Sequence, residues 1–299
     1  MDQPGATLAR ALTDGRLVEL VDEASPLRPA LDAIGRRHSR PLQIQIAGRP
    51  GTGRDTMARA VRERLAVTAI GPGEAAEGAR DADLWLYVLT GPPRRADRKA
   101  LSALPAELTM VVLGKADTFG DWETATEVAH QCAAVLELPV APVSQLLACA
   151  DLRDDEYNFL RMLHLAGEEM PSMAGQFLVG SIAHLPVPDD VAPLETSERL
   201  MRANLMSRVD QFGIQAALDL IASGHPASAD AAALNTALRN ASGIDVLRDA
   251  IGDRVGQVRV RRDVQARAAI DDLAAAGEDR DVLEQALQLD GDVAEGDRS

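Results

Sequence analysis

The stretch that decides the fold is residues 42–60, LQIQIAGRPGTGRDTMARA. It begins with alternating apolar and polar side chains, which is the period of a strand with one face in the core. A glycine-rich turn follows over 48–53, and the residues after it favour a helix. A strand that passes through a glycine turn into a helix is the first unit of an α/β fold, in which helices cover a sheet.

Strand and helix patterns continue to alternate along the first half of the chain. Apolar runs predict further strands at 66–70, 84–89, 109–113 and 139–143. Helical patterns separate these runs. The alternation predicts a mostly parallel sheet that is covered on both faces.

The second half of the chain has no strand pattern. Apolar residues at helical spacing predict helices over 151–169, 198–223, 244–255 and 257–275. The N-terminal segment is also expected to be helical. The expected division is N-terminal helices over 1–40 that pack on the bundle, an α/β domain over 41–150, an all-α bundle over 151–276 and an acidic, partly frayed tail over 277–299.

Composition excludes several classes of protein. The 299 residues suggest about two domains, and the net charge of −15 argues against broad binding of nucleic acid or anionic lipid. The chain has no stretch of about 20 uncharged apolar residues, and charged side chains in its first 20 residues do not fit a signal peptide. We therefore expect a cytoplasmic protein, at most peripheral to a membrane.

The glycine turn departs from the phosphate-binding motif G-x-x-x-x-G-K-[ST] at its two chemical positions. Gly48 and Gly53 have the required spacing, but Arg54 replaces the lysine that reaches the phosphates. Asp55 replaces the hydroxyl that holds Mg²⁺, and its charge repels a phosphate at the start of the helix. Thr56 stands one residue too late for the metal. The turn could therefore serve only to make a tight connection between strand and helix.

Later segments add a family resemblance. Residues 114–117, Gly-Lys-Ala-Asp, resemble the guanine-reading N-K-x-D motif of GTPases with its asparagine replaced by Gly114. Residues 143–146, Val-Ser-Gln-Leu, resemble the fifth GTPase motif, and Ile70 replaces the metal-contacting aspartate of the third. With a helical second half, the chain resembles the dynamin-like branch of translation-factor-type GTPases. The resemblance implies a vestigial nucleotide site at Gly48, Gly51, Gly53, Arg54, Lys115, Asp117 and Ser144.

The departures from the family predict a loss of catalysis. The helix over 55–65 runs almost directly into the next strand, so the first switch and its threonine have no room. Phosphoryl transfer depends on the metal and on positioned charges. The resemblance then implies a pseudo-GTPase with no catalytic residue, no metal and no cofactor beyond weak GTP or GDP binding. Its partner would be an intact dynamin-like GTPase, whose membrane-associated assembly it regulates or completes.

Two alternatives remain open at this stage. The chain could be a nucleotide-binding switch or a weak NTPase that uses Arg54 and Thr56, although Thr90 stands where the metal-binding acid of such an enzyme would end its strand. It could also be a purely structural adaptor. Nucleic acid is not expected as a partner, and a membrane is expected only through the partner GTPase.

Other candidate residues favour structural roles. The five histidines are scattered, and Cys132 has no basic cluster near it. The uncharged run 171–188 fits either a membrane-touching tip or, as the preferred interpretation, a short buried helix over 172–185. Five arginines are expected to form a basic patch at one edge of the sheet: Arg49, Arg54, Arg94, Arg95 and Arg98.

Overall fold

The computed structural model describes residues 8–74, 82–171, 173–180 and 197–296. The chain divides into two compact units. One unit is Gln43–Gly252, which we call the sheet unit, and the other joins Met1–Leu42 to Asp253–Ser299, which we call the terminal unit.

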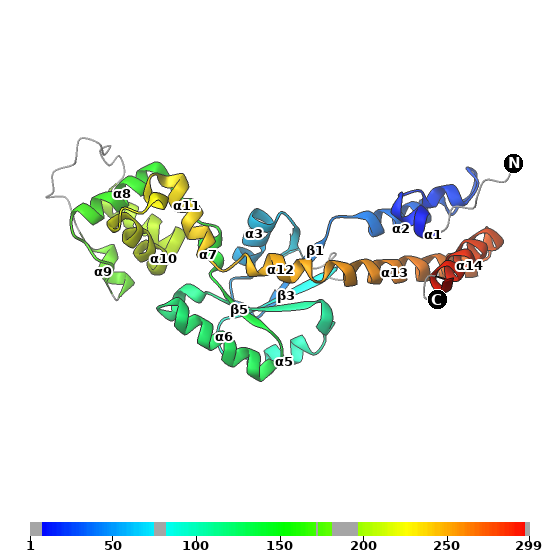
Figure 1. Ribbon diagram of the computed structural model, residues 1–299, viewed down its shortest axis with the longest axis horizontal. Coiled ribbons are helices and arrows are strands. Elements are labelled where there is room, and N and C mark those ends of the chain that lie inside the picture. The colour runs from blue at the N-terminus through cyan, green and yellow to red at the C-terminus, as the bar shows by residue number, and fades with distance from the viewer. Residues whose placement is uncertain (1–7, 75–81, 172, 181–196, 297–299) are drawn as a thin grey trace. The chain divides into compact units, whose positions relative to one another are not determined.

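The sheet unit contains a five-stranded, all-parallel sheet of order β2-β1-β3-β4-β5 (Figure 1). The strands are β1 (Gln43–Gly48), β2 (Thr68–Ile70), β3 (Leu84–Leu89), β4 (Thr109–Gly114) and β5 (Val140–Val143). The sequence predicted these strands within two residues at each end, and the α/β class with a parallel sheet is confirmed.

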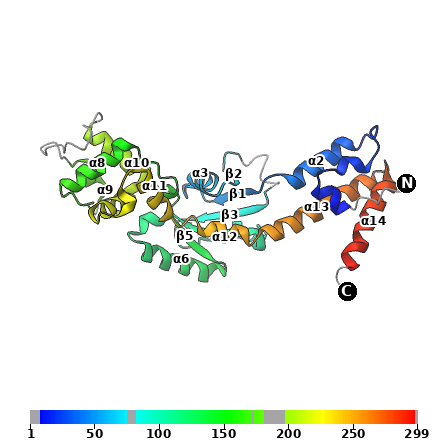
Figure 2. The same cartoon turned by 45° about the horizontal axis from the view of Figure 1, so that its top comes forward.

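Helices lie on both faces of this sheet. Helix α3 (Arg54–Leu65) lies on one side, and α5 (Arg95–Leu101) and α6 (Trp122–Leu136) lie on the other (Figures 1 and 2). Every residue of β3 and β4 is buried, which is why both strands read as continuous apolar runs. On the α6 side, Tyr87, Leu113 and Cys132 belong to one apolar cluster.

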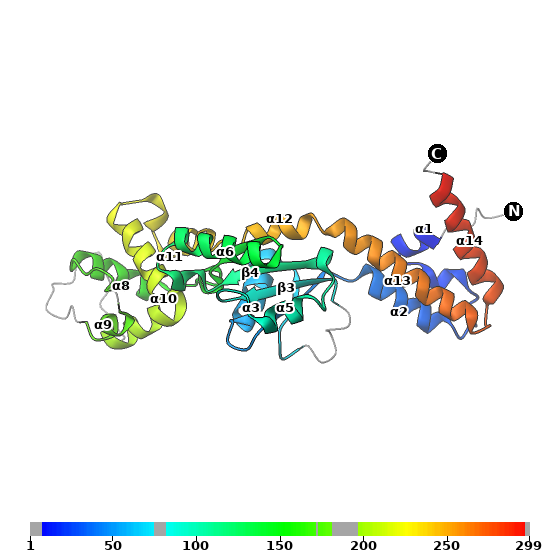
Figure 3. The ribbon, with the colours of Figure 1, turned by 90° about the horizontal axis from the view of Figure 1, so that it is seen from below.

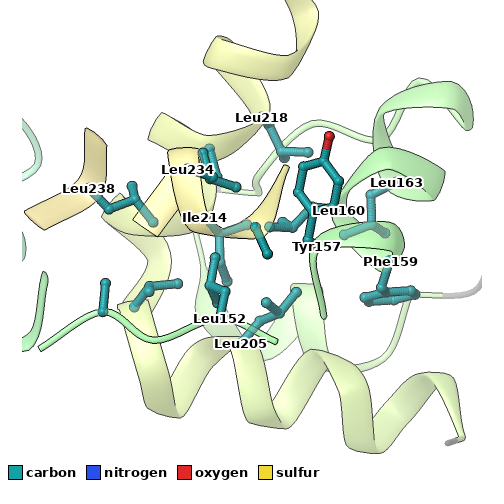
Figure 4. Packing of buried hydrophobic residues seen from close by; sticks show 14 of the residues in the cluster. Leu152, Tyr157, Phe159, Leu160, Leu163, Leu205, Ile214, Leu218, Leu234 and Leu238 are labelled. Atoms are coloured by element: carbon teal, nitrogen blue, oxygen red, sulfur yellow. The ribbon is translucent and has the colours of Figure 1, made fainter. Parts of the chain in front are cut away.

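Helices that follow β5 build a second core within the sheet unit. They are α7 (Gln145–Ala148), α8 (Asp154–Leu165), α9 (Ala174–Leu178), α10 (Glu198–Ala222) and α11 (Ala231–Asn240), with the 3₁₀ turn η4 (Pro226–Ser228) between the last two. The sheet unit also contains α12 (Val246–Gly252) and the 3₁₀ turns η2 (Ala106–Leu108), before β4, and η3 (Ala116–Phe119), after it. Figure 4 shows the packing of this core around Phe159, Leu205, Ile214 and Leu234, all fully buried. Leu147 of α7 belongs to the same cluster, so this core begins directly at the end of the sheet.

A buried arginine holds α9 against α10. Arg202 is 0% exposed, and its guanidinium donates hydrogen bonds to the carboxylates of Glu168 and Glu198 and to the carbonyl oxygen of Phe177. It also lies 4.8 Å from the ring centroid of Phe177. A buried cation needs such complete pairing, because an unpaired charge inside a protein costs several kcal/mol, about 3–5 when a pair is broken.

The terminal unit is built from both ends of the chain. Its elements are α1 (Leu8–Thr13), η1 (Leu17–Leu20), α2 (Arg28–Ser39), α13 (Val255–Ala275) and α14 (Arg280–Gly296). Helices α2 and α13 lie side by side (Figures 1 and 3), and Leu12, Leu31, Ile270 and Leu283 share one buried cluster. Arg262 of α13 adds hydrogen bonds to backbone carbonyls at the end of α2.

The structure corrects two expectations about the helical parts. The helices of residues 1–40 were expected to pack on one bundle over 151–276. They do pack on α13, which lies in that range, but α13 and α14 belong to the terminal unit, whereas α8, α10 and α11 share a different apolar cluster. The tail 277–299 was expected to fray, but Arg280–Gly296 is a helix whose Leu283 is fully buried. Leucines at helical spacing stabilise α14, although its charges alone suggest a solvated tail.

Candidate functional site

The candidate site lies at the carboxyl ends of β1 and β3. The chain leaves β1, forms β2 on one side of it and then crosses to form β3 on the other side, so the topology reverses between β1 and β3. Ligands of open α/β sheets bind outside the carboxyl ends of the strands at such a reversal. The glycine turn after β1 occupies this position.

Two glycines of the turn cannot be replaced without strain. Gly48 has φ +141°, and a Cβ atom there would lie 2.7 Å from the carbonyl oxygen of Val88. Gly53 has φ +81° immediately before α3, and a Cβ atom there would lie 2.4 Å from Nε2 of Gln145. Side chains rarely adopt either conformation. These glycines therefore let the turn lie against β3 on one side and against Gln145 on the other.

Gln145 connects the glycine turn to the loop after β4. Its side chain is 3% exposed, and Nε2 donates a hydrogen bond to the carbonyl oxygen of Thr52 over 3.2 Å. Its Oε1 accepts a hydrogen bond from the backbone N–H of Lys115 over 2.8 Å. Sequence reasoning missed this residue, although its place directly after Ser144 was visible. Gly53 and Lys115, two of the expected site residues, therefore both lie next to the Gln145 side chain.

The same glutamine accounts for Gly114, which stands where the N-K-x-D motif has an asparagine. A Cβ atom on Gly114 would lie 2.7 Å from Cγ1 of Val88 and 3.1 Å from Oε1 of Gln145. These distances leave no room for an asparagine while Gln145 holds its present position. The glutamine thus fills the space between the two loops and makes the hydrogen bonds that connect them.

A buried carboxylate fixes the first arginine of the turn. Arg49 donates from Nε to both carboxylate oxygens of Asp97, at 2.9 and 3.1 Å, and the Tyr87 hydroxyl donates to the same group over 2.9 Å. Burial alone would raise the pKa of Asp97, but hydrogen bonds from the Arg94 backbone, Tyr87 and Arg49 lower it overall. Burial and this hydrogen bond raise the pKa of Tyr87. Arg49 is therefore neutralised locally and does not extend a free basic patch.

The residues at the start of α3 differ in their surroundings. Arg54 is partly buried and forms no ion pair within the described residues. Asp55 is exposed in the first turn, where the helix dipole stabilises a carboxylate. A carboxylate at this point opposes the binding of a phosphate, so the sequence-based objection to a phosphate site also applies to the folded chain.

Ser144 and Asp117 lie together at the ends of β4 and β5. Ser144 is fully buried, and its hydroxyl caps α7 by accepting a hydrogen bond from the Leu147 N–H over 3.3 Å. Burial raises the pKa of Asp117, Asp210 raises it further, and a hydrogen bond from Ser144 opposes the shift. Oδ1 of Asp117 has no hydrogen-bond partner within the described residues. The arrangement leaves one carboxylate oxygen without a donor.

A pocket of about 550 Å³ is lined by Asp117 and by the middle of α10. The lining residues from α10 include Asp210, Phe212 and Gln215. Asp210 interrupts the helix with φ 57° and ψ −177°, a conformation that costs about 1–3 kcal/mol outside glycine. The sequence pattern predicted one continuous helix over 198–223. The break in α10 therefore lies beside Asp117, the carboxylate in the segment that resembles the guanine-reading motif.

The remaining candidates do not add a catalytic centre in the described part of the chain. No group of three His, Cys, Asp or Glu side chains among the described residues lies close enough to hold a metal ion. Cys132 is buried, and burial raises its pKa, as expected for a core residue. None of the described helices combines the length and the apolar character needed to cross a bilayer.

The uncharged run 171–188 is only partly described. The structure shows α9 over Ala174–Leu178, which is shorter than the helix predicted over 172–185, and residues 172 and 181–188 lie outside the described part. Phe177 is buried, whereas Met173 and Val179 are exposed.

Taken together, the expected nucleotide-site residues occupy one edge of the sheet unit. Gly48, Gly51, Gly53 and Arg54 belong to the turn after β1 and the start of α3, Lys115 and Asp117 follow β4, and Ser144 follows β5. Comparison of the chain with protein-family models, with curated proteins and with solved structures found no match.

Proposed function

We propose that the chain is a non-catalytic pseudo-GTPase that pairs with an intact dynamin-like GTPase and regulates or completes its membrane-associated assembly. The supporting features are the parallel sheet, the glycine turn at the topological reversal and the loops after β4 and β5 that carry Lys115, Asp117 and Ser144. The family itself is inferred from the sequence resemblance described above.

The observation that carries the loss of catalysis is the connection between α3 and β2. Helix α3 ends at Leu65 and β2 begins at Thr68, so only Ala66 and Val67 join them. A GTPase needs a longer segment here to bring a threonine to Mg²⁺. With Asp55 at the start of α3, the site lacks the charges that stabilise a transferring phosphoryl group.

Residual nucleotide binding is the second candidate function. Arg54 forms no ion pair within the described residues, and Oδ1 of Asp117 lacks a donor, so both groups could contact a nucleotide. One charged hydrogen bond contributes only about 1.5–3 kcal/mol. Without metal and lysine contacts we expect a dissociation constant no tighter than about millimolar, equivalent to about −4 kcal/mol.

Equilibrium binding of GTP and of ATP, with and without Mg²⁺, separates the candidates. The pseudo-GTPase predicts weak binding that Mg²⁺ does not strengthen, with guanine preferred over adenine if Asp117 still reads the base. A nucleotide switch predicts a dissociation constant in the micromolar range that tightens with Mg²⁺. A purely structural adaptor predicts no difference between the wild type and Asp117→Ala with either nucleotide.

A further inference from the structure

Four exposed cations lie within six consecutive residues at the edge of the sheet unit. Arg94, Arg95, Arg98 and Lys99 are all exposed, and none forms an ion pair within the described residues. We call this set the α5 basic face. Several other exposed arginines have acidic neighbours on their own helix, as in the pairs of Arg36 with Asp32, Arg59 with Glu63 and Arg280 with Glu284.

The placement of Arg94 and Arg95 is unfavourable for α5, whereas Arg98 and Lys99 lie in its last turn, where the helix dipole favours positive charge. Arg94 precedes α5 and Arg95 is its first residue, at the end where the helix dipole disfavours positive charge. Arg95 is spaced three residues from Arg98 and four from Lys99, so the like charges are neighbours on one helix surface and repel one another. Helix stability therefore gives no reason for Arg94 and Arg95.

The opposite side of α5 holds the basic face in a fixed position. Asp97 is 0% exposed and accepts hydrogen bonds from Arg49, from Tyr87 and from the backbone N–H of Arg94. Leu101 is also buried. The cations are thus presented by a helix that is anchored to the glycine turn and to β3, which lowers the cost of ordering them on binding.

We propose that the α5 basic face binds an acidic segment of a partner protein. The chain carries a net charge of −15, so an extended polyanion such as RNA or an anionic bilayer meets repulsion from the rest of its surface. A short acidic segment contacts the basic face alone, and the complementary charges select and orient it. The inference rests on the proposed function only in taking the partner to be a protein.

The test uses the full-length chain and a fluorescent synthetic peptide of alternating glutamate and serine. Binding is followed by anisotropy at about 50 mM salt, where a Debye length of about 14 Å leaves surface charges only partly screened. The double variant Arg95→Gln, Arg98→Gln is expected to bind the peptide about fivefold more weakly than wild type. The matched control is Arg199→Gln, Arg259→Gln, which removes two exposed arginines that also lack ion pairs within the described residues, and it should stay within about twofold of wild type.

Three results would overturn the inference. They are equal weakening in the two double variants, no peptide binding by the wild type, and tighter binding of single-stranded RNA or of phosphatidylserine vesicles through Arg95 and Arg98. The last would assign the face to a nucleic acid or a lipid surface. Nucleotide hydrolysis by the chain would contradict the proposed function and leave the peptide result unchanged, so the two failures are distinguishable.

Discussion

At the scale of single residues, Gln145 is the side chain that organises the candidate site. It is buried and bridges the Thr52 carbonyl and the Lys115 N–H, two backbone groups that belong to different loops. No local pattern could reveal this role, because the bridge depends on loops that are 93 and 30 residues away in sequence. The sequence did reveal the glycines and the missing asparagine that make the bridge possible.

Truncation of Gln145 tests the bridge. We expect Gln145→Ala to lower the free energy of unfolding by about 2–4 kcal/mol, because two backbone groups lose their partner and a cavity forms. Gln131→Ala is the control, since Gln131 is exposed on α6 and its amide donates a hydrogen bond to Glu127 of the same helix. Urea denaturation should show a change below about 0.5 kcal/mol for the control. Equal losses in the two variants would contradict the bridge.

Placing at position 114 the asparagine of the GTPase motif that this segment resembles should destabilise the protein. Gly114→Asn places a Cβ atom 2.7 Å from Val88 Cγ1 in a packed interior. We expect a loss of about 1–3 kcal/mol in unfolding free energy and no gain in GTP affinity. Thermal unfolding and GTP titration of the variant measure both effects. A stable variant that binds GTP more tightly would show that the site still accepts the family's own arrangement.

The Asp97 carboxylate predicts a pH dependence of stability. Its pKa is lower in the folded chain than in the unfolded one, where an aspartate titrates near about 3.9. The stabilisation is therefore present above that pH and is lost as the pH falls through the folded pKa. We expect Asp97→Asn to cost about 2–4 kcal/mol at pH 7, with a smaller difference from wild type below about pH 4. Urea unfolding across this pH range measures the difference in unfolding free energy. A difference that does not change with pH would contradict stabilisation by the ionised Asp97 carboxylate.

At the scale of elements, the strands were predictable and the break in α10 was not. Continuous apolar runs such as 84–89 and 109–113 have few interpretations other than buried strands, because both faces of a parallel sheet are covered. Helix α10 has apolar residues at helical spacing on both sides of Asp210, so its pattern carries no sign of the break. Aspartate tolerates positive φ better than most residues, but this single feature is too common to predict a kink.

The break in α10 gives a prediction of its own. Asp210→Gly should raise the free energy of unfolding by about 0.5–1 kcal/mol, because glycine adopts the strained φ without a steric penalty. Asp219→Gly, in the regular part of the same helix, should lower it by about 1 kcal/mol. Chemical denaturation of the two variants measures both changes in unfolding free energy. Destabilisation of similar size in both would mean that residue 210 carries no strain.

At the scale of the whole molecule, the sequence led us to merge two separate helical groups. The helices of the terminal unit and of the sheet unit have apolar residues at the same helical spacing. This spacing does not determine which helices pack against each other. Leu12, Leu31, Ile270 and Leu283 show the actual partners, which come from opposite ends of the chain. Contacts between such distant segments are a property of the fold and are not encoded in local spacing.

This division predicts the behaviour of truncated chains. Deleting residues 1–40 alone should expose Ile270 and Leu283 and cause aggregation, because α13 and α14 lose their apolar cover. The matched fragment 43–252 lacks both halves of the terminal unit and should remain monomeric with a cooperative unfolding transition. Light scattering and thermal melts compare the two truncated chains. Aggregation of the fragment 43–252, together with a monomeric chain lacking residues 1–40, would contradict the packing of the N-terminal helices on α13 and α14.

The measurement that tests the central claim most directly is GTP hydrolysis by the purified full-length chain with Mg²⁺ in excess. We predict no turnover above that of Asp117→Ala, and also none for the double variant Arg54→Lys, Asp55→Ser, because rebuilding the phosphate-binding consensus does not lengthen the connection between α3 and β2. Mg²⁺-dependent hydrolysis by the wild type that clearly exceeds the Asp117→Ala control would contradict the account.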